Sequence, residues 1–184
     1  VKAVTPKMIE PVARRFAEEG IEAVAVCFLH SYCNGRNEDR ARALIESLLP
    51  GVFVSTSAEV VPEFREYERF STTVLNAYVA PPIDRYLRRL KVGLKEGGLD
   101  GPFHVMTSSG GVMSPGEAAR LPVNLLFSGP AGGVTAAAHL SHLKGEQRLI
   151  AYDMGGTSTD VCLIRDGTPA MTTEAEVFGY PNKT

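Results

Sequence analysis

The chain has little of what marks a disulfide-stabilised, nucleic-acid-binding or membrane protein. Only three of its 184 residues are cysteine, and so sparse and odd a set excludes a disulfide framework and is typical of a reducing compartment. The formal net charge is −2, which leaves no basic field to attract nucleic acid or an anionic lipid surface. No apolar run is long enough to span a bilayer, and no signal-peptide pattern opens the chain. We therefore expect a cytoplasmic protein with no nucleic acid and no membrane among its partners.

Two common nucleotide-binding motifs are also absent from the sequence. No segment reads G-x-x-x-x-G-K-[ST], which excludes a Walker A loop, and no G-x-G-x-x-G spacing precedes a helix. The hydrophobic content of 44% and the charged content of 22% are those of an ordinary globular protein of one domain or slightly more. Because both motifs are absent, a nucleotide phosphate would have to be held by a hairpin turn.

Three potential metal ligands, Cys27, His30 and Cys33, lie at three-residue intervals. A structural zinc site normally takes four ligands from paired clusters, and no second cluster follows in the sequence. Cys27 is also expected inside a buried strand. The spacing therefore does not favour zinc, although a metal role for His30 or for the two cysteines stays open.

The first third of the chain predicts a strand–helix–strand unit. Thr5-Pro6 is a good helix start, and Gly20 ends that helix. Residues 21–29 are almost wholly apolar, as in a strand that is covered on both faces. Asn37 is expected to cap a second helix, and residues 52–55 form the next short strand. A helix between two such strands indicates a βαβ unit with parallel strands.

A long helix is expected from Pro62 to about residue 79, where Pro81-Pro82 breaks it. The polar residues of this segment fall on one helix face: Arg65, Arg69, Thr72 and Asn76. Such a stripe is ordinarily a solvated face. If it faces a cleft, however, two arginines and an amide could hold an anionic or amide-bearing substrate. A further helix, with apolar positions between residues 83 and 94, follows the prolines.

Residues 103–106 predict another short strand, which ends in the polar loop TSSGG. Ligands of open α/β sheets bind at the carboxyl ends of strands, so Ser108, Ser109 and Gly110 are candidate substrate contacts. Residues 114–117 have the pattern of a capping box. These features place a possible binding loop directly before a helix.

The segment 127–133 is rich in small residues and leads into an alanine-rich helix at residues 134–143. Small side chains there indicate close approach of either a neighbouring helix or a nucleotide. Packing is the commoner reason, so this segment alone does not indicate a binding site.

Residues 149–165 contain two short apolar runs that bracket adjacent glycines and three hydroxyl residues, which is a strand–turn–strand signal. Backbone N–H groups of such a turn can approach an anion closely. The flanking Asp153 and Asp160 would repel a bare phosphate, so their presence makes sense if a divalent cation lies between them and the anion. A plain Gly-Gly hairpin with solvated acids is the alternative.

The pattern D-x-G-G-T-x-x-D between two strands resembles the phosphate hairpin of the actin-like ATPases, which carry one such hairpin in each of two related domains. Longer segments are similar to the hydantoinase A / oxoprolinase family, and SSGGVMS resembles its SNGG loop, with Ser109 where Asn is usual. The other matching segments are DMGGTSTDV at residues 153–161, SGPAGGV at 128–134, REYERFSTTVLNAYVAP at 65–81 and AVCFLHSY at 25–32. Together these segments span most of the chain.

The resemblance implies an α/β fold of the actin-like ATPase (ribonuclease H-like) type, with a mixed sheet flanked by helices and a phosphate-binding β-hairpin. Residues 1–146 would form the C-terminal part of the first actin-like domain. Residues 147–184 would form the opening strands of the second. The family's first phosphate hairpin is missing and its glycine-rich nucleotide loop would follow Thr184, so we expect a piece of a longer protein that does not catalyse alone.

The resemblance also implies ATP-dependent opening of a cyclic amide such as hydantoin, N-methylhydantoin or 5-oxoproline, together with a hydantoinase B-type partner subunit or domain. ATP would phosphorylate an amide or enol oxygen before water attacks. A subunit of an acetone or acetophenone carboxylase and a non-catalytic nucleotide switch are the alternatives. The implied site residues are Asp153 and Asp160 for catalysis and for Mg²⁺ through water; Gly155, Gly156, Thr157, Ser158, Gly132 and Gly133 for ATP; and Arg65, Arg69, Asn76, Ser108, Ser109 and Gly110 for the substrate.

Two positions distinguish this chain within the resemblance. Many actin-like relatives carry an acidic or amide residue near the small-residue helix to orient water, whereas the matching Ser128-Gly129-Pro130 has none. This absence favours phosphorylation of a bound substrate over simple ATP hydrolysis. Asn37-Glu38 stands where relatives often have His-Glu, so a role of that histidine would not carry over.

Overall fold

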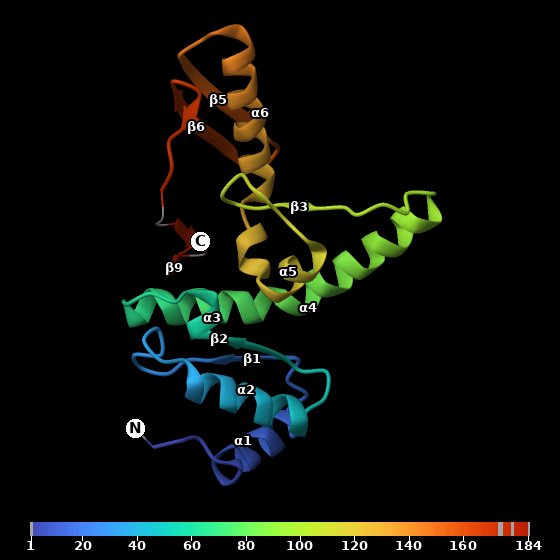
Figure 1. The fold of residues 1–184 in the computed structure, drawn as a ribbon, viewed down its shortest axis with the longest axis vertical. Helices are drawn as coiled ribbons and strands as arrows, with labels where there is room; N and C mark the ends of the chain where they lie inside the picture. Colours follow the sequence, from blue (N-terminus) through green and yellow to red (C-terminus); the bar gives the residue numbers. More distant parts are fainter. Residues whose placement is uncertain (1, 173–174, 178, 184) are drawn as a thin grey trace. The chain divides into compact units, whose positions relative to one another are not determined.

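The computed structural model describes residues 2–172, 175–177 and 179–183, which form two compact units (Figure 1). The N-terminal unit comprises the described residues of 1–100, 119–123 and 174–183. The hairpin unit comprises those of 101–118 and 124–173. The domain boundary expected at residue 146 stays a prediction, because it refers to two domains of a longer protein.

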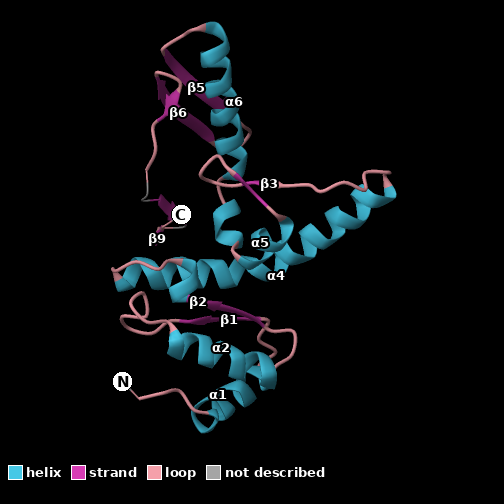
Figure 2. Ribbon diagram, viewed as in Figure 1, coloured by secondary structure: helices cyan, strands magenta, loops and turns pink. Residues whose placement is uncertain are grey.

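The N-terminal unit is built on a parallel βαβ unit, as the sequence predicts (Figure 2). Helix α1 (Pro6–Glu18) precedes strand β1 (Ala23–Val26), helix α2 (Arg36–Leu48) and strand β2 (Phe53–Thr56). The strands pair in register from Ala23 opposite Phe53 to Val26 opposite Thr56. The apolar side chains of both strands and of α2 form the core of the unit: Val4, Val24, Val26, Ala41, Ile45 and Val54.

The start of α2 differs from the prediction. Gly35 is the N-cap, and Asn37 lies inside the first helical turn. The Asn37 side chain instead accepts a hydrogen bond from the backbone N–H of Val4 (3.2 Å) and donates one to the carbonyl of Lys2 (3.2 Å). The prediction that Asn37 caps the helix was wrong, because its amide satisfies the extended segment before α1.

The long helix α4 (Glu66–Glu96) follows the one-turn helix α3 (Ser57–Val60) and begins later than predicted. Arg65 has a φ of 81°, a left-handed conformation that cannot continue a right-handed helix from Pro62. The helix also continues through Pro81 and Pro82, where a break was predicted. Each proline lacks the N–H for an i→i−4 hydrogen bond, but α4 is buried on both sides of the pair, at Ala80 and Leu87. We infer that this packing offsets the lost hydrogen bonds.

A short antiparallel hairpin completes the N-terminal unit. Strand β8 (Ala175–Val177) pairs with β9 (Tyr180–Asn182), and β9 packs against α4. The backbone N–H of Lys183 donates to the Thr72 hydroxyl (2.9 Å), so the buried face of α4 also holds this returning segment.

The hairpin unit begins with the antiparallel pair β3 (Val105–Met106) and β4 (Val112–Met113). The TSSGG loop follows the carboxyl end of a short strand, as predicted, and it closes an antiparallel hairpin. Helix α5 (Pro115–Arg120) and the 3-10 turn η1 (Pro122–Leu125) follow in the chain, and their residues 119–123 belong to the N-terminal unit. The predicted capping box is confirmed, because the Glu117 N–H donates to the Ser114 hydroxyl (3.3 Å) and the Ser114 N–H to the Glu117 carboxylate (3.1 Å).

Helix α6 (Ser128–Lys144) packs against a three-stranded antiparallel sheet of β5 (Arg148–Met154), β6 (Thr159–Arg165) and β7 (Thr168–Pro169). The predicted strand–turn–strand is thus confirmed. The described strands form four small sheets rather than one. Alternate side chains of β5 and β6 leave one apolar face exposed: Ile150, Tyr152, Met154, Val161 and Leu163. None of the described helices is long and apolar enough to cross a lipid bilayer.

A substitution at Gly35 tests the close packing between the start of α2 and α3. A Cβ added at Gly35 would lie 2.9 Å from the Cβ of Ala58, and neither atom can rotate away. Because overpacking of this kind costs about 1–3 kcal/mol, Gly35→Ala is expected to lower the free energy of unfolding by that amount in urea denaturation. Gly116→Ala is the control, since a Cβ there meets no atom within 4 Å; equal stability of the two variants would contradict the packing.

Candidate nucleotide and substrate sites

The acidic hairpin places its two aspartates directly opposite one another. Asp153 of β5 pairs with Asp160 of β6 in the antiparallel register. The turn between the strands is closed by a hydrogen bond from the Gly155 N–H to the Ser158 carbonyl (2.9 Å), and residues 155–158 are exposed. Cβ atoms of directly opposed residues lie about 4.5–5.5 Å apart, and like charges at this spacing are destabilising. A cation between the two carboxylates would remove that repulsion.

A cavity of about 260 Å³ lies between α6 and this hairpin. Both aspartates line it, together with the small residues of α6. A Cβ at Gly133 would lie 3.9 Å from Oδ2 of Asp153, which shows how closely the helix backbone approaches this carboxylate. The predicted residues Gly133, Asp153 and Asp160 are therefore brought together inside one unit.

The oxygen atoms at this cavity fit a hard divalent cation. Mg²⁺ prefers oxygen ligands and usually keeps several waters when a protein supplies one or two carboxylates. Within the described ranges, no group of three or more His, Cys, Asp or Glu side chains could hold a metal ion. The pair Asp153 and Asp160 therefore suits a hydrated Mg²⁺ better than a fully protein-ligated metal.

The predicted substrate loop lies against α6 in the same unit. Gly110 has a φ of 82°, and a Cβ there would be 2.9 Å from the Thr135 hydroxyl. The Ser108 hydroxyl donates to the Asn124 carbonyl (2.9 Å) and accepts from the Phe127 N–H (3.0 Å). A Cβ at Gly132 would lie 3.9 Å from the Met106 side chain of β3. Glycine is thus needed at Gly110, whereas a Cβ at Gly132 would make an ordinary van der Waals contact.

Ser109 shares a hydrogen bond with the Thr107 hydroxyl (2.9 Å). Its side chain therefore takes part in the internal bonding of the loop. The direct contact of Ser108, Ser109 and Gly110 with a substrate stays a prediction.

The predicted arginine–amide stripe of the N-terminal unit lies mostly inside the protein. Arg69, Thr72 and Asn76 have no solvent exposure, so the ordinary expectation of a solvated face was wrong for these three residues. Asn76 donates to the Ser55 hydroxyl (2.9 Å) and the Arg120 carbonyl (3.2 Å) and accepts from Val123 N–H (3.1 Å). This amide is therefore fully used in joining α4 to its neighbours.

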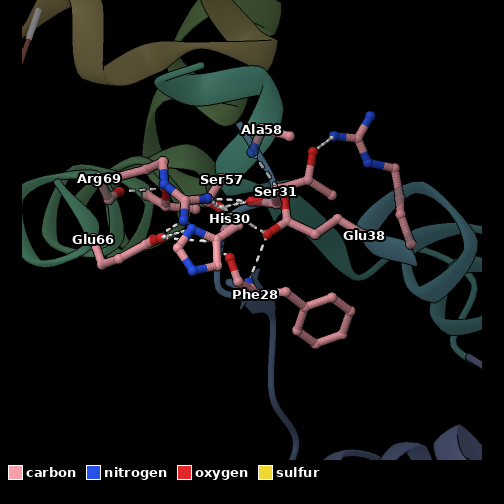
Figure 3. Close-up of polar contacts among 11 residues, drawn as sticks. Phe28, His30, Ser31, Glu38, Ser57, Ala58, Glu66 and Arg69 are labelled. Carbon is pink, nitrogen blue, oxygen red and sulfur yellow. Dashed lines mark hydrogen bonds and ion pairs between the residues drawn. The ribbon is translucent and has the colours of Figure 1, made fainter. Parts of the chain in front are cut away.

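Arg69 is the centre of a buried polar network at the carboxyl ends of β1 and β2 (Figure 3). Its guanidinium donates to the Phe28 carbonyl (3.0 Å) and to the hydroxyls of Ser31 and Ser57, and it forms an ion pair with Glu66. Its Nη1 also lies 4.0 Å from the Glu38 carboxylate. The loop after β1, helix α3 and helix α4 meet at this one side chain.

Glu38 is the second member of this network, and sequence reasoning did not identify it as such. Its carboxylate accepts hydrogen bonds from the Phe28 N–H (2.7 Å), the Ser57 hydroxyl (2.7 Å) and the Ala58 N–H (2.8 Å). The side chain is completely buried. The only signal in the sequence was a glutamate on the otherwise apolar inner face of α2, close to Ala41 and Ile45.

Arg65 differs from Arg69 because it borders open space. It is exposed, its guanidinium lies 3.7 Å from Glu68, and it lines a cavity of about 290 Å³ in the N-terminal unit. Asn182 and Lys183 of the returning segment line the same cavity. Contact of Arg65, Arg69 and Asn76 with a substrate remains a prediction, and Arg65 is the member with access to a cavity.

The cysteine and histidine positions after β1 are chemically unequal. Burial, with a contribution from the nearby Glu38 charge, raises the pKa of the Cys27 thiol to about 11, so this thiol stays protonated near neutral pH. Cys33 is exposed. His30 has a φ of 57°. Its backbone N–H donates to Oε1 of Glu66 (2.9 Å), and its ring Nδ1 lies 3.8 Å from the same oxygen.

The fold, including the acidic glycine hairpin next to a small-residue helix, is that of the actin-like ATPases. Two solved structures share it: nucleotide-free acetone carboxylase, with a TM-score of 0.81, and the ATP-dependent caprolactamase from Pseudomonas jessenii, with a TM-score of 0.73. Each is 30% identical to this chain and covers 96% of it, which corresponds to 25% and 30% of the respective solved chains.

The sequence profile of the hydantoinase/oxoprolinase family matches residues 69–184, and that of the hydantoinase/oxoprolinase N-terminal region matches residues 1–49. The chain belongs to the hydantoinase/oxoprolinase family. It is 40% identical over 171 residues to an uncharacterised protein of Methanocaldococcus jannaschii and 38% identical over 166 residues to the caprolactamase subunit alpha of P. jessenii. These alignments cover 93% and 90% of this chain but about a quarter of each relative.

The buried pair of Glu38 and Arg69 gives a stability prediction. Glu38→Ala removes one of the two carboxylates beside the buried guanidinium and leaves three donors without an acceptor, so it is expected to cost about 3–5 kcal/mol in urea denaturation. The control is Glu19→Ala, which removes an exposed pair with Arg15 and is expected to change stability by less than about 1 kcal/mol. The double variant Glu38→Leu/Arg69→Met is expected to lose less than the sum of the single changes. Equal effects of Glu38→Ala and Glu19→Ala would refute this role of the network.

Proposed function

We propose that the chain contributes part of the ATP site of an enzyme that phosphorylates and hydrolytically opens cyclic amides. The observation that carries the proposal is the pair of directly opposed carboxylates, Asp153 and Asp160, which line one cavity beside an exposed glycine–hydroxyl turn. Membership of the hydantoinase/oxoprolinase family supports the choice of substrate class.

In this proposal the hairpin binds the transferring phosphate and its metal. Gly155 and Gly156 let the turn backbone approach the phosphate, and Thr157 and Ser158 add hydroxyl donors. Asp153 and Asp160 hold a hydrated Mg²⁺, which would neutralise charge that develops on the phosphate during transfer. Gly132 and Gly133 allow the backbone of α6 to lie close to the same place.

The reaction that we propose has two steps. The γ-phosphoryl group of ATP is first transferred to the amide oxygen of the ring. The phosphorylated amide is then hydrolysed: water adds to the activated carbon, the ring C–N bond breaks to leave an acyl phosphate and a free amine, and a second water converts the acyl phosphate to the carboxylate and inorganic phosphate. Ser128-Gly129-Pro130 offers no acidic or amide side chain to orient water against ATP itself, which supports transfer to a substrate over simple hydrolysis.

Substrate binding is proposed for two groups of residues, one in each unit. Arg65, with access to a cavity, is proposed to contact an anionic or amide group, while the buried Arg69 and Asn76 hold the helix that carries it. The loop of Ser108, Ser109 and Gly110 is proposed to contribute in the hairpin unit. We further propose that the enzyme is cytoplasmic. We also propose a hydantoinase B-type partner, because the relatives of this chain include a subunit of caprolactamase.

A subunit of a ketone carboxylase is the second candidate function. The structural likeness to acetone carboxylase favours it, and the same phosphate hairpin could serve phosphorylation of an enol oxygen. A nucleotide switch that transforms no small substrate is the alternative from a different class.

A substrate screen separates these functions. The full-length protein, with its partner subunit, is incubated with ATP and with hydantoin, 5-oxoproline, caprolactam or acetone, and phosphate release and product are measured. We expect phosphate release that depends on a cyclic amide and matches ring-opened product in amount. Acetone-dependent turnover would support the carboxylase, and ATP turnover unaffected by all four compounds would sink the cyclic-amide proposal.

Asp153→Asn tests the metal-positioning role of the hairpin. Loss of one carboxylate is expected to lower kcat by roughly 100-fold or more, because charge stabilisation at the transferring phosphate is weakened. Calorimetry should also show that Mg²⁺ no longer strengthens binding of a non-hydrolysable ATP analogue. Asp166→Asn in the turn after β6 is the matched control, since asparagine tolerates its φ of 51°. Normal turnover in the Asp153 variant would refute the assignment.

A further inference from the structure

The loop directly after β1 is fixed in place by the buried charged network. The backbone N–H of Phe28 donates to Glu38 (2.7 Å), and the Phe28 carbonyl accepts from Arg69 (3.0 Å). The hydroxyl of Ser31, which is 4% exposed, accepts from the same guanidinium. The network therefore fixes the loop on both sides of His30, whose own side chain is 78% exposed. A rigid support of this kind is what an exposed side chain needs if it must hold one position.

His30 has the contacts of a histidine that an acid orients. Its backbone N–H donates to Oε1 of Glu66 (2.9 Å), and its ring Nδ1 lies 3.8 Å from the same oxygen. The second distance is that of an ion pair, and contacts of catalytic groups are often this long before a substrate binds. Glu66 is itself held by an ion pair with the buried Arg69, as Figure 3 shows. The acid thus faces Nδ1, and the second ring nitrogen, Nε2, belongs to the exposed part of the ring.

Two left-handed backbone conformations meet at Glu66. Among the described residues other than glycine, only His30, Arg65 and Asp166 have a positive φ. Asp166 precedes Gly167 in the tight turn between β6 and β7, which accounts for its conformation. His30 (57°) contacts Glu66, and Arg65 (81°) directly precedes it in the chain. Such conformations persist where the surroundings fix them, and they cluster at catalytic and ligand sites.

The same part of the N-terminal unit contains the proposed substrate contact. Arg65 lines the cavity of about 290 Å³ and is one residue from the acid that His30 faces. The loop of His30 also follows the carboxyl end of a parallel strand, where ligands of α/β sheets bind. An exposed imidazole and an arginine with access to a cavity therefore lie on either side of one carboxylate in the sequence and in space.

Ring opening requires a group that moves protons. When water adds and the C–N bond breaks, both hydrogens of the water end on the ring nitrogen, which becomes the free amine. Histidine accepts and donates protons near neutral pH. Cys27 of the same loop is unsuitable, because burial raises the pKa of its thiol to about 11.

We propose that His30 is the proton-transfer residue of ring opening and that Glu66 positions its imidazole. The inference rests on the proposed function, which supplies the phosphorylated amide. Nε2 accepts one proton as the water oxygen bonds to the activated carbon, and the imidazolium donates this proton to the ring nitrogen. The hydroxyl proton of the adduct follows the same route as the C–N bond breaks. The products are the acyl phosphate and the amine, and the imidazole is regenerated.

Rapid-quench measurements separate this role from phosphoryl transfer. The full-length protein, with its partner subunit, is mixed with ATP and with the cyclic amide that the substrate screen shows to be opened, and ADP and ring-opened product are measured within the first turnover. His30→Asn removes the proton-transfer group, and asparagine tolerates the φ of 57°. The matched control is His139→Asn, which replaces an exposed histidine of α6. Circular dichroism confirms that both variants are folded.

We expect His30→Asn to form ADP at about the wild-type rate in the first turnover but to form ring-opened product about 100-fold more slowly. The control is expected to match the wild type in both rates. His30→Gly suits the same backbone conformation, and added imidazole is expected to restore part of its product formation. A side chain that only stabilised the loop would not be replaced by imidazole in solution.

Three results would overturn the inference, and they differ in what they say about the reaction. Product formation by His30→Asn at the wild-type rate overturns the role of His30 and leaves the proposed reaction intact. An equal loss of ADP and of product also overturns it, because His30 would then serve phosphoryl transfer. If the wild-type protein forms no ADP in response to any cyclic amide, the proposed function itself fails, and the role of His30 fails with it.

Discussion

The N-terminal unit depends on one buried ion pair. The carboxylate of Glu38 and the guanidinium of Arg69 are both removed from water, and each would be very costly to bury alone. Hydrogen bonds to Phe28, Ser57 and Ala58 satisfy the carboxylate. These bonds fix the loop after β1 and the start of α3 against α2, and Arg69 connects the first turn of α4 to the same loop and to Ser57. The network therefore specifies how a small parallel βαβ unit is joined to a helix that is much longer than its strands.

The hairpin unit shows the opposite use of charge. Asp153 and Asp160 face each other across two strands, and the described part of the chain has no ion pair that neutralises either carboxylate. Glycines at the turn and at Gly133 reduce the side-chain bulk around them. An arrangement that is unfavourable without a cation, placed where a helix backbone and an exposed turn converge, is typical of a site built for a metal-bound phosphate. This contrast separates Glu38, whose carboxylate is fully hydrogen-bonded, from the two acids proposed to bind the metal.

Local patterns in the sequence predicted the elements whose stability is local. The βαβ unit, the Ser114–Glu117 capping box and the strands around Gly155 and Gly156 follow from periodicity and turn chemistry, and all three are confirmed. Pro81-Pro82 was misread, because proline rules describe the helix backbone, whereas packing on both sides of the pair maintains this helix. The polar stripe of α4 was ambiguous for a similar reason. Helical spacing places Arg69 and Asn76 on one face, but only the tertiary partners show that this face is buried.

The same limit explains why the candidate site could be predicted in part. Asp153 and Asp160 could be chosen as candidates because an acid on each side of a glycine turn is a local pattern, for which a plain hairpin with solvated acids was the alternative. Arg65 and Arg69 are separated by one helical turn and have the same chemistry, yet one borders a cavity and the other is fully enclosed. Arg69 reaches the buried carboxylate of Glu38, which is distant in the sequence, whereas Arg65 lies 3.7 Å from Glu68 on its own helix. Only the tertiary partners of the two arginines therefore show which one is buried and which one has access to a cavity.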